Sequence, residues 1–307
     1  MMYILSLNPC MDKTLSLPQM DLDNPNRVLL ERTDVGGKGV NVARVVNALE
    51  GNGLLMGFDY HGRPVEKAME KEGVPCALLP VDGEMRVNLK IRETNIGRTV
   101  EINEKGVFHD AGLLQQMENA LLERCAAGDY VALCGSLPNG APRDFYGRLV
   151  KKLKEKGCFA AVDCDGEALE KALLAGPSLI KPNLPEFLAL TGSSDASLPA
   201  LTEKCRAFHE KGVAMICLSL GPDGALLSTR DAAYFCPAAD VPVLGTQGAG
   251  DSMLGGFLFA LSMGQTLPES LQFASAAAGA SIIRPGTLLC TKEDTDLLLS
   301  GLQAVSV

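Results

Sequence analysis

Short apolar runs alternate with longer amphipathic segments over most of the chain. The apolar runs are three to six residues long and lie at residues 3–7, 54–56, 130–134, 159–163, 178–180 and 215–220. Gly, Pro, Asp or Asn bounds them, which is typical of buried strands. Between strand candidates, apolar residues recur at helical spacing, as in 113–121 and 145–153. This alternation predicts an α/β fold with a mostly parallel sheet and helices on both faces.

Two regions depart from this pattern. Residues 13–17 with 27–33, and residues 87–92 with 99–103, alternate apolar and polar positions with no helix between them. Such alternation indicates antiparallel strands with one face in water. We expect a small antiparallel β lid, with its strands within about residues 12–33 and 86–104. No repeat or low-complexity linker divides the chain, so we expect a single domain over residues 1–307.

Composition narrows the class of protein. Of 307 residues, 47% are apolar and 21% charged, as in a soluble globular protein with a large core. The 28 basic and 37 acidic residues give a net charge of −9, which excludes a global positive field that would hold nucleic acid. Any site for a phosphate group must therefore be local.

The sequence also indicates where in the cell the protein is located. Residues 1–7 form a short apolar run without the basic residues that begin a cleavable secretion signal, and Asn8-Pro9 ends the run too early for one, so we expect no such signal. No apolar stretch is long enough to span a membrane. The 10 cysteines are spread along the chain without a C-x-x-C motif, and the 3 histidines are far apart. We expect buried, reduced thiols in a cytoplasmic protein without a zinc site and without a membrane partner.

The strongest local signal is the Gly-rich segment 245–252, which leads into an apolar helical stripe. The first N–H groups of such a helix have no internal partner, and the helix dipole favours an anion there. Gly248 and Gly250 let the backbone approach a phosphate, and Asp251 places a carboxylate at the edge of that site. Alternatively, Asp251 only caps the helix and the glycines only form a tight turn.

A second Gly cluster, residues 34–44, also leads into a helix. Its backbone N–H groups, the Asn41 amide and the Lys38 ammonium suit a ligand rich in hydroxyls. The alternative is another turn with a solvated lysine. Neither cluster fits the P-loop or dinucleotide-binding pattern, because Arg32 and Met253 stand where those patterns need glycine.

Together these segments are similar to two family signatures. Residues 36–43 (GGKGVNVA) and 248–251 (GAGD) resemble the signatures of the ribokinase/PfkB family of sugar kinases. Further landmarks of that family occur in the expected order: Asn8-Pro9 with Asp12, residues 86–90, residues 101–103, residues 135–138, Lys181-Pro182-Asn183 with Glu186, and Ser219-Leu220-Gly221 with Asp223-Gly224. The match spans nearly the whole chain and implies a ribokinase-like fold.

The resemblance implies a phosphotransferase with an alcohol group as acceptor, which moves the γ-phosphoryl of ATP to a sugar hydroxyl. The family's catalytic base falls on Asp251, and the amides of Gly248, Ala249 and Gly250 form its anion hole. Phosphoryl transfer depends on positioning and charge stabilisation, which suits this set. We expect Asp251 to have an ordinary pKa near ~3.9 and to be ionised at neutral pH. The alternative, a catalytically silent sugar or nucleotide sensor on the same fold, would require the loss of Asp251.

The resemblance also implies a nucleotide and metal side. Asn183 and Glu186 match family residues that organise Mg²⁺, usually through water, which suits a cation that keeps its hydration. Alternatively, the pair only begins a helix. Further nucleotide-binding positions are Ser219, Gly221 and Gly224, with Gly248 and Gly250.

On the sugar side, the resemblance implies that hydroxyls are held by side chains and amides of Asp12, Asn41, Gly36 and Gly37. Arg27, Lys90 and Ser136 match positions that contact a phosphate already on the substrate, and Lys38 and Arg86 belong to the same basic group. The alternative for the lid residues is a solvated basic face.

Residues 85–91 and 98–106 resemble the branch that contains 1-phosphofructokinase and tagatose-6-phosphate kinase. This implies a ketohexose phosphate as acceptor: fructose 1-phosphate, converted to fructose 1,6-bisphosphate, with tagatose 6-phosphate or fructose 6-phosphate as alternatives. We also expect a homodimer formed through the lid, because exposed sheet edges favour pairing.

Three residues depart from the family pattern: Gly245, Gln247 and Asp165. Asp165 stands where serine is common among phosphosugar kinases. A carboxylate facing a phosphate would disfavour it, so a kinase of an unphosphorylated sugar or a nucleoside remains open.

Overall fold

A ten-stranded sheet forms the centre of the protein in the computed structural model, which describes residues 1–107 and 110–307. In spatial order its strands are β14 (Val305–Ser306), β13 (Ala233–Cys236), β12 (Ala225–Thr229), β11 (Met215–Ser219), β10 (Leu179–Ile180), β9 (Phe159–Asp163), β8 (Tyr130–Cys134), β1 (Met2–Ser6), β4 (Gly53–Asp59) and β5 (Cys76–Pro80). Neighbouring strands from β11 to β5 run parallel. The predicted mostly parallel α/β fold is confirmed.

The edge formed by β12, β13 and β14 is antiparallel, which the sequence pattern did not predict. Strand β12 is almost entirely buried, so its side chains do not alternate between apolar and polar. A buried run of this kind gives no information about strand direction.

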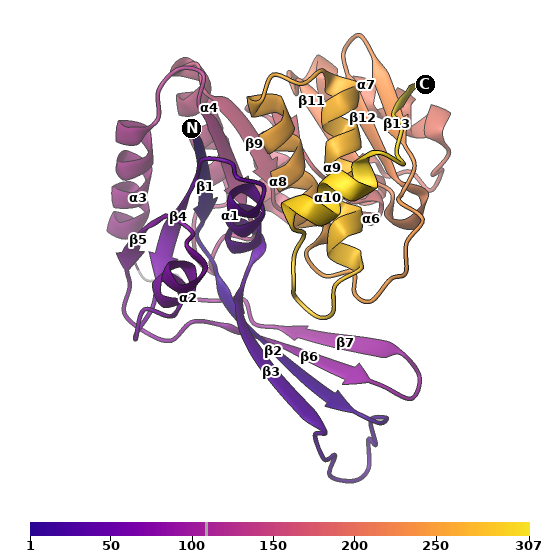
Figure 1. The fold of residues 1–307 in the computed structure, drawn as a ribbon. Coiled ribbons are helices and arrows are strands. Elements are labelled where there is room, and N and C mark those ends of the chain that lie inside the picture. Colours follow the sequence, from indigo (N-terminus) through magenta and orange to yellow (C-terminus); the bar gives the residue numbers. More distant parts are fainter. Residues whose placement is uncertain (108–109) are drawn as a thin grey trace.

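Helices cover both faces of this sheet. Figure 1 shows α1 (Lys38–Ala48), α8 (Ala249–Ser262), α9 (Leu267–Ile282) and α10 (Lys292–Leu299) in front of it, and α4 (Phe145–Glu155) behind it. Helix α4 packs against α3 (Ala111–Arg124) and α5 (Gly166–Leu173). The remaining helices are α2 (Pro64–Glu72), α6 (Leu184–Thr191) and α7 (Leu198–Glu210), with a 3₁₀ turn at Gly221–Asp223.

Helix α8 is buried between α1 and α9, and two glycines allow this close packing. A Cβ on Gly255 would lie 2.6 Å from Val45 Cγ1, and a Cβ on Gly256 would lie 2.9 Å from Ala277 Cβ. The apolar stripe predicted after Asp251 is buried here, with Phe257 inaccessible to solvent. Burial of such a side chain stabilises the fold by roughly 1.5–3 kcal/mol. This packing fixes the position of the N-terminus of α8.

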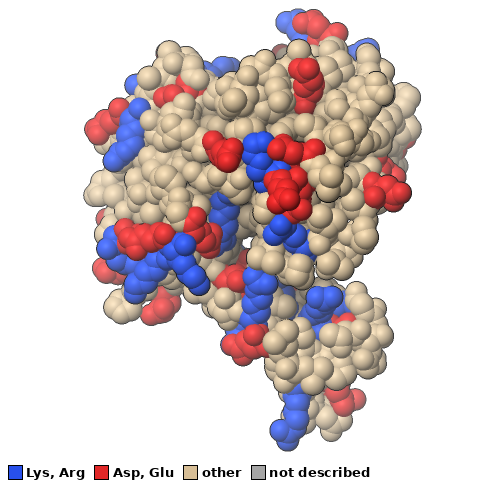
Figure 2. Space-filling model, viewed as in Figure 1, with Lys and Arg blue, Asp and Glu red and all other residues tan. Residues whose placement is uncertain are grey.

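A second, four-stranded sheet projects from the body (Figures 1 and 2). Its order is β3 (Leu30–Gly36), β2 (Cys10–Leu17), β6 (Val87–Glu93) and β7 (Arg98–Asn103). The outer pairs are antiparallel, as predicted, while the central pair β2–β6 is parallel. The strand expected at residues 27–33 begins later, at Leu30, and runs to Gly36. We call this sheet the lid.

All ten cysteines are free thiols, and nine of them are buried. His109 lies outside the described residues. Among the helices within residues 1–107 and 110–307, none is long and apolar enough to cross a membrane.

Candidate active site

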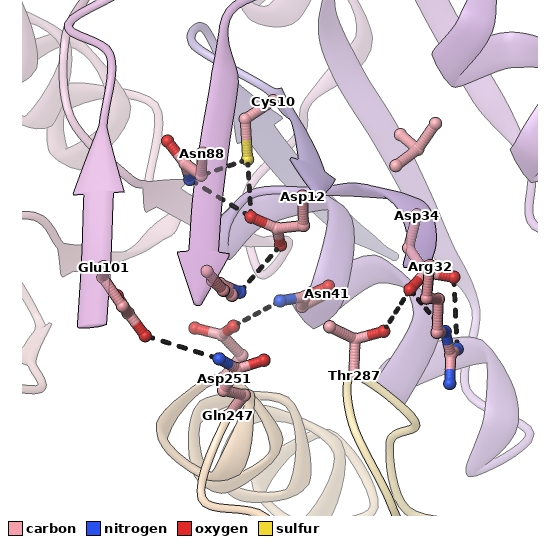
Figure 3. Close-up of polar contacts among 12 residues, drawn as sticks. Cys10, Asp12, Arg32, Asp34, Asn41, Asn88, Glu101, Gln247, Asp251 and Thr287 are labelled. Atoms are coloured by element: carbon pink, nitrogen blue, oxygen red, sulfur yellow. Dashed lines mark hydrogen bonds and ion pairs between the residues drawn. The ribbon is translucent and has the colours of Figure 1, made fainter. Parts of the chain in front are cut away.

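The two Gly-rich segments meet at the N-terminus of α8. Gly248 precedes the helix with φ of 74°, and a Cβ there would lie 2.3 Å from Leu289 Cδ2, so the turn requires glycine. Asp251, in the first turn of α8, is 8% exposed. Its Oδ2 accepts a hydrogen bond from Asn41 Nδ2 of α1 at 2.7 Å (Figure 3). The predicted base and a predicted sugar-binding residue are therefore in direct contact.

The environment of Asp251 makes it a stronger base than the sequence suggested. Burial, followed by the nearby Asp163 carboxylate, raises the pKa of Asp251 from 3.8 to about 6. The Asn41 hydrogen bond and the Lys38 and Lys181 ammonium groups oppose that rise. The expectation of an ordinary pKa is wrong because the carboxylate is buried. Asp251 is still mostly ionised above pH 7.

Two lysines converge on Asp163, which lies at the end of β9. Its Oδ1 accepts a hydrogen bond from Lys38 Nζ at 2.7 Å, and Lys181 Nζ forms an ion pair with Oδ2 at 3.2 Å, outside hydrogen-bond geometry. Burial alone would raise the pKa of Asp163, but the charges of Lys181 and Lys38 outweigh it and hold that pKa below its usual value. Asp163 is thus a buried anion between two cations.

Lys181 also lies beside the backbone of the proposed anion hole, since a Cβ on Gly250 would be 3.3 Å from its Nζ. The sequence analysis did not assign Lys181 or Asp163 to the site. Lys181 directly follows β10, and Asp163 is the last residue of β9; both strands are buried and parallel. The carboxyl ends of such strands are where α/β folds bind ligands. That position was the signal that could have identified them.

The predicted sugar-binding carboxylate, Asp12, lies on β2 of the lid and is buried. Lys90 Nζ forms an ion pair with its Oδ2 at 3.3 Å, and Asn88 Nδ2 donates to its Oδ1 at 3.2 Å (Figure 3). A Cβ on Gly36 would lie only 2.2 Å from Asp12 Oδ2, so this approach requires glycine. The ammonium group of Lys90, which we expect to contact phosphate, is paired with Asp12 in this structure.

A cavity of about 420 Å³ lies beside Asn88, which is one of its lining residues. Its charged lining is mainly basic: Lys38, Arg86, Lys105 and Arg143, with the acidic Glu104 and Asp165. Ser136 also lines it, whereas the exposed Arg27 is not among the lining residues. The structure thus brings Lys38, Arg86 and Ser136 together, as expected, and also brings in Asp165.

Lys105 and Arg143 were missed by the sequence analysis. Lys105 lies between β7 and α3, and Arg143 lies between β8 and α4. Neither stands at a position of regular apolar and polar spacing, and the resemblance over residues 98–106 gave Lys105 no role of its own. Only the fold brings these connections to one cavity.

The predicted nucleotide-side residues lie at the carboxyl ends of β10 and β11. Asn183 and Ser219 form a bridge between these two ends. Asn183 caps α6: its Oδ1 accepts from the Glu186 amide at 2.8 Å, and its own amide donates to Glu186 Oε2 at 2.9 Å. Gly224 has φ of 117°, and a Cβ there would lie 2.1 Å from Cys236 O. Gly221 has φ of 64°.

Two contacts join the lid to the loops around α8. Gln247 Nε2 lies 3.4 Å from Glu101 Oε1 of β7, and Thr287 Oγ1 donates to Asp34 Oδ2 of β3 at 2.8 Å (Figure 3). Gln247 is one of the departures from the family pattern, and here it contacts the lid. Both outer strands of the lid therefore touch loops that flank the N-terminus of α8.

Comparison with known proteins gives a consistent result over this whole arrangement. The sequence profile described as "pfkB family carbohydrate kinase" matches residues 6–294. The 1-phosphofructokinase of Rhodobacter capsulatus is 33% identical over 277 residues, covering 89% of this chain and 87% of that protein. The tagatose-6-phosphate kinase of Staphylococcus epidermidis is 30% identical over 283 residues, covering 90% of each.

Among solved structures, phosphofructokinase-2 from Escherichia coli in complex with substrates and products is similar, with a TM-score of 0.92. The two share 27% sequence identity, and the alignment covers 98% of each chain. Both the body and the lid are therefore included in the match.

Proposed function

The chain belongs to the pfkB family of carbohydrate kinases, and from this premise we propose that it phosphorylates a ketohexose phosphate with ATP. The proposed substrate is fructose 1-phosphate, and the product is fructose 1,6-bisphosphate. The observation that carries this proposal is the cavity lined by Lys38, Arg86, Lys105 and Arg143. Asn88 also lines it, and its Nδ2 donates to Asp12. In a chain with a net charge of −9, such a group of basic side chains is a local site for an anion. The names of the two curated relatives support a sugar phosphate.

In the proposed reaction, Asp251 accepts the proton of the attacking sugar hydroxyl. That oxygen bonds to the γ-phosphorus of ATP while the bond to the β–γ bridging oxygen breaks, and ADP leaves. The Asn41 hydrogen bond orients the carboxylate. A positioned base of this kind contributes about 10²–10⁴ in rate.

The charge that develops on the transferring group meets the first amides of α8, from Ala249 and Gly250, after the turn at Gly248. We propose that Lys38 and Lys181 add to this stabilisation. Asp163 keeps both ammonium groups in place, because its buried charge pairs with each of them.

Mg²⁺ would supply charge neutralisation on the nucleotide phosphates. Glu186 and Asn183 offer one carboxylate and one amide, and no cluster of three or more His, Cys, Asp or Glu side chains suited to a metal occurs within residues 1–107 and 110–307. Such a sparse donor set fits a cation held mainly by water and by substrate phosphates. We propose that Glu186 holds it through water, with the nucleotide along Ser219, Gly221 and Gly224.

For the sugar, we propose that the Asp12 carboxylate accepts hydrogen bonds from hydroxyls and that the Asn41 amide donates to them or accepts from them. Arg86 and Ser136 bind the phosphate. Asp165 supports a second candidate, a kinase of an unphosphorylated sugar or a nucleoside, because it lines the same cavity. A carboxylate there accepts hydrogen bonds from hydroxyls and repels phosphate.

We also propose a homodimer formed through the lid. Leu30 of β3 and Ile102 of β7 are 66% and 55% exposed, and Leu29, directly before β3, is 66% exposed, so apolar side chains of the lid face solvent. Ten free thiols support a reducing, cytoplasmic location.

The test is ADP release with Mg-ATP against a panel of sugars, ranked by kcat/KM. The panel contains fructose 1-phosphate, fructose 6-phosphate, tagatose 6-phosphate, fructose, ribose and nucleosides. We expect fructose 1-phosphate to rank first. A nucleoside or neutral sugar in first place would refute the proposal and favour the second candidate.

A further inference from the structure

We propose that Asn8 is a positioning residue that assembles the phosphate-binding side of the cavity. This inference rests on the proposed function, because it assumes that the cavity binds the phosphate of the substrate. Asn8 follows β1, at the carboxyl edge of the central sheet, and is 5% exposed. Our proposal gives it no direct contact with the reacting atoms.

Asn8 contacts three segments that are distant in the sequence. Its Nδ2 donates to the Lys105 carbonyl oxygen at 3.0 Å and to Ser136 Oγ at 3.1 Å. Its backbone oxygen accepts from Arg86 Nε at 3.1 Å. Each of these three partners lines the cavity. One asparagine therefore joins the β5–β6, β7–α3 and β8–α4 connections.

These contacts also direct the donors of the cavity. Because Ser136 Oγ accepts from Asn8, its own hydrogen is available to another acceptor, such as a phosphate oxygen. Arg86 is fixed by Asn8 through Nε and by Asn88 Oδ1 and the Glu104 carbonyl oxygen through Nη1. This leaves its Nη2 for a ligand, in the fixed geometry that suits an anion.

The packing around Asn8 supports a role beyond filling space. Its buried Oδ1 has no hydrogen-bond partner among the described residues, which is costly for the fold. Gly106 lies against this oxygen so closely that a Cβ there would be 2.2 Å away. The cost of the unpartnered Oδ1 is offset by the two hydrogen bonds that Nδ2 donates, and Gly106 permits the close approach of the Lys105 segment.

The test compares the preference of each variant for the sugar phosphate that ranks first in the panel over the same sugar without phosphate. Asn8→Ala removes the donor without adding charge. We expect the ratio of the two kcat/KM values to fall by about tenfold or more, through a higher KM for the sugar phosphate. The KM for ATP and the turnover of the unphosphorylated sugar should stay as in the wild type.

A second variant perturbs Asn8 from outside. Gly106→Ala forces a Cβ onto Oδ1 at a residue with φ of 73°. Gly73→Ala is the matched control, because Gly73 has φ of 70° and open space around its Cβ position. We expect Gly106→Ala to reduce the phosphate preference and Gly73→Ala to retain it, even if both lower the melting temperature.

Two results would overturn the inference. The first is an unchanged preference in Asn8→Ala and Gly106→Ala, and the second is an equal loss with both sugars, which indicates only a structural role. If the wild type itself prefers the unphosphorylated sugar, the proposed function fails together with this inference. If the wild type prefers the sugar phosphate and the variants keep that preference, only the role of Asn8 is refuted.

Discussion

Replacing Asp251 with asparagine should make the protein more stable while it makes the enzyme nearly inactive. The carboxylate is ionised above pH 7 in a buried position where its pKa is raised from 3.8 to about 6. A rise of that size corresponds to a penalty of about 3 kcal/mol on the charged form in the folded state. The amide oxygen of the introduced asparagine could still accept a hydrogen bond from Asn41 Nδ2, so the neutral variant keeps this contact without the penalty.

The sign of the pH dependence follows from linkage. Below the unfolded pKa of 3.8, Asp251 is protonated in both states and costs nothing. Between pH 3.8 and about 6 the unfolded state loses its proton first, so the penalty grows, and above about pH 6 it is complete. We therefore expect Asp251→Asn to be more stable than the wild type by up to about 3 kcal/mol at pH 8, with little difference near pH 4.

Urea unfolding at pH 4, 6 and 8 measures this difference. The exposed Asp82, changed to asparagine, is the control and should leave the free energy of unfolding nearly unchanged. If Asp251→Asn were no more stable than the wild type at pH 8, burial would not be the cause of the raised pKa, and our account of the base would be wrong.

Three further predictions follow from the site. First, kcat/KM for the sugar should fall about tenfold per pH unit below about pH 6, because protonated Asp251 cannot accept the hydroxyl proton; a profile that stays flat to pH 4.5 would contradict this. Second, Gly36→Ala should raise the KM for the sugar by tenfold or more with the KM for ATP unchanged, because its Cβ would lie 2.2 Å from Asp12 Oδ2; equal changes in both KM values would argue against the assignment of Asp12. Third, Leu30→Glu should shift the proposed dimer to monomer in light scattering at micromolar concentration, since it places a charge on an exposed apolar position of the lid; a wild-type monomer would refute the dimer itself.

Much of the body of the protein was predictable from local pattern. Strands such as β8 and β9 are short apolar runs with clear boundaries, and α8 is an apolar helical stripe that begins after a Gly-rich turn. The contact between Asn41 and Asp251, which are 210 residues apart, could not be derived from pattern alone. The family signatures predicted that both belong to one site, and the packing of α1 against α8 gives the physical reason.

Other features depend on the environment that only the fold creates. The pKa of Asp251 depends on its burial near Asp163, which the sequence analysis had not connected to it. Lys90 was expected to contact phosphate because it matches such a position in the family, and only the fold shows that Asp12 on the adjacent strand β2 is its partner. Lys105 and Arg143 stand in irregular connections, where no periodicity marks a residue that points into a cavity.

The measurement that tests the central claim most directly is the ratio of kcat/KM for fructose 1-phosphate to that for fructose, in the wild-type enzyme with Mg-ATP. The cavity offers several charged donors to one phosphate, and two or three such hydrogen bonds, at about 1.5–3 kcal/mol each, are together worth at least about 10² in this ratio. We predict a preference for fructose 1-phosphate of that order or greater. Equal or better use of fructose would show that the basic cavity does not bind a substrate phosphate and would contradict the account.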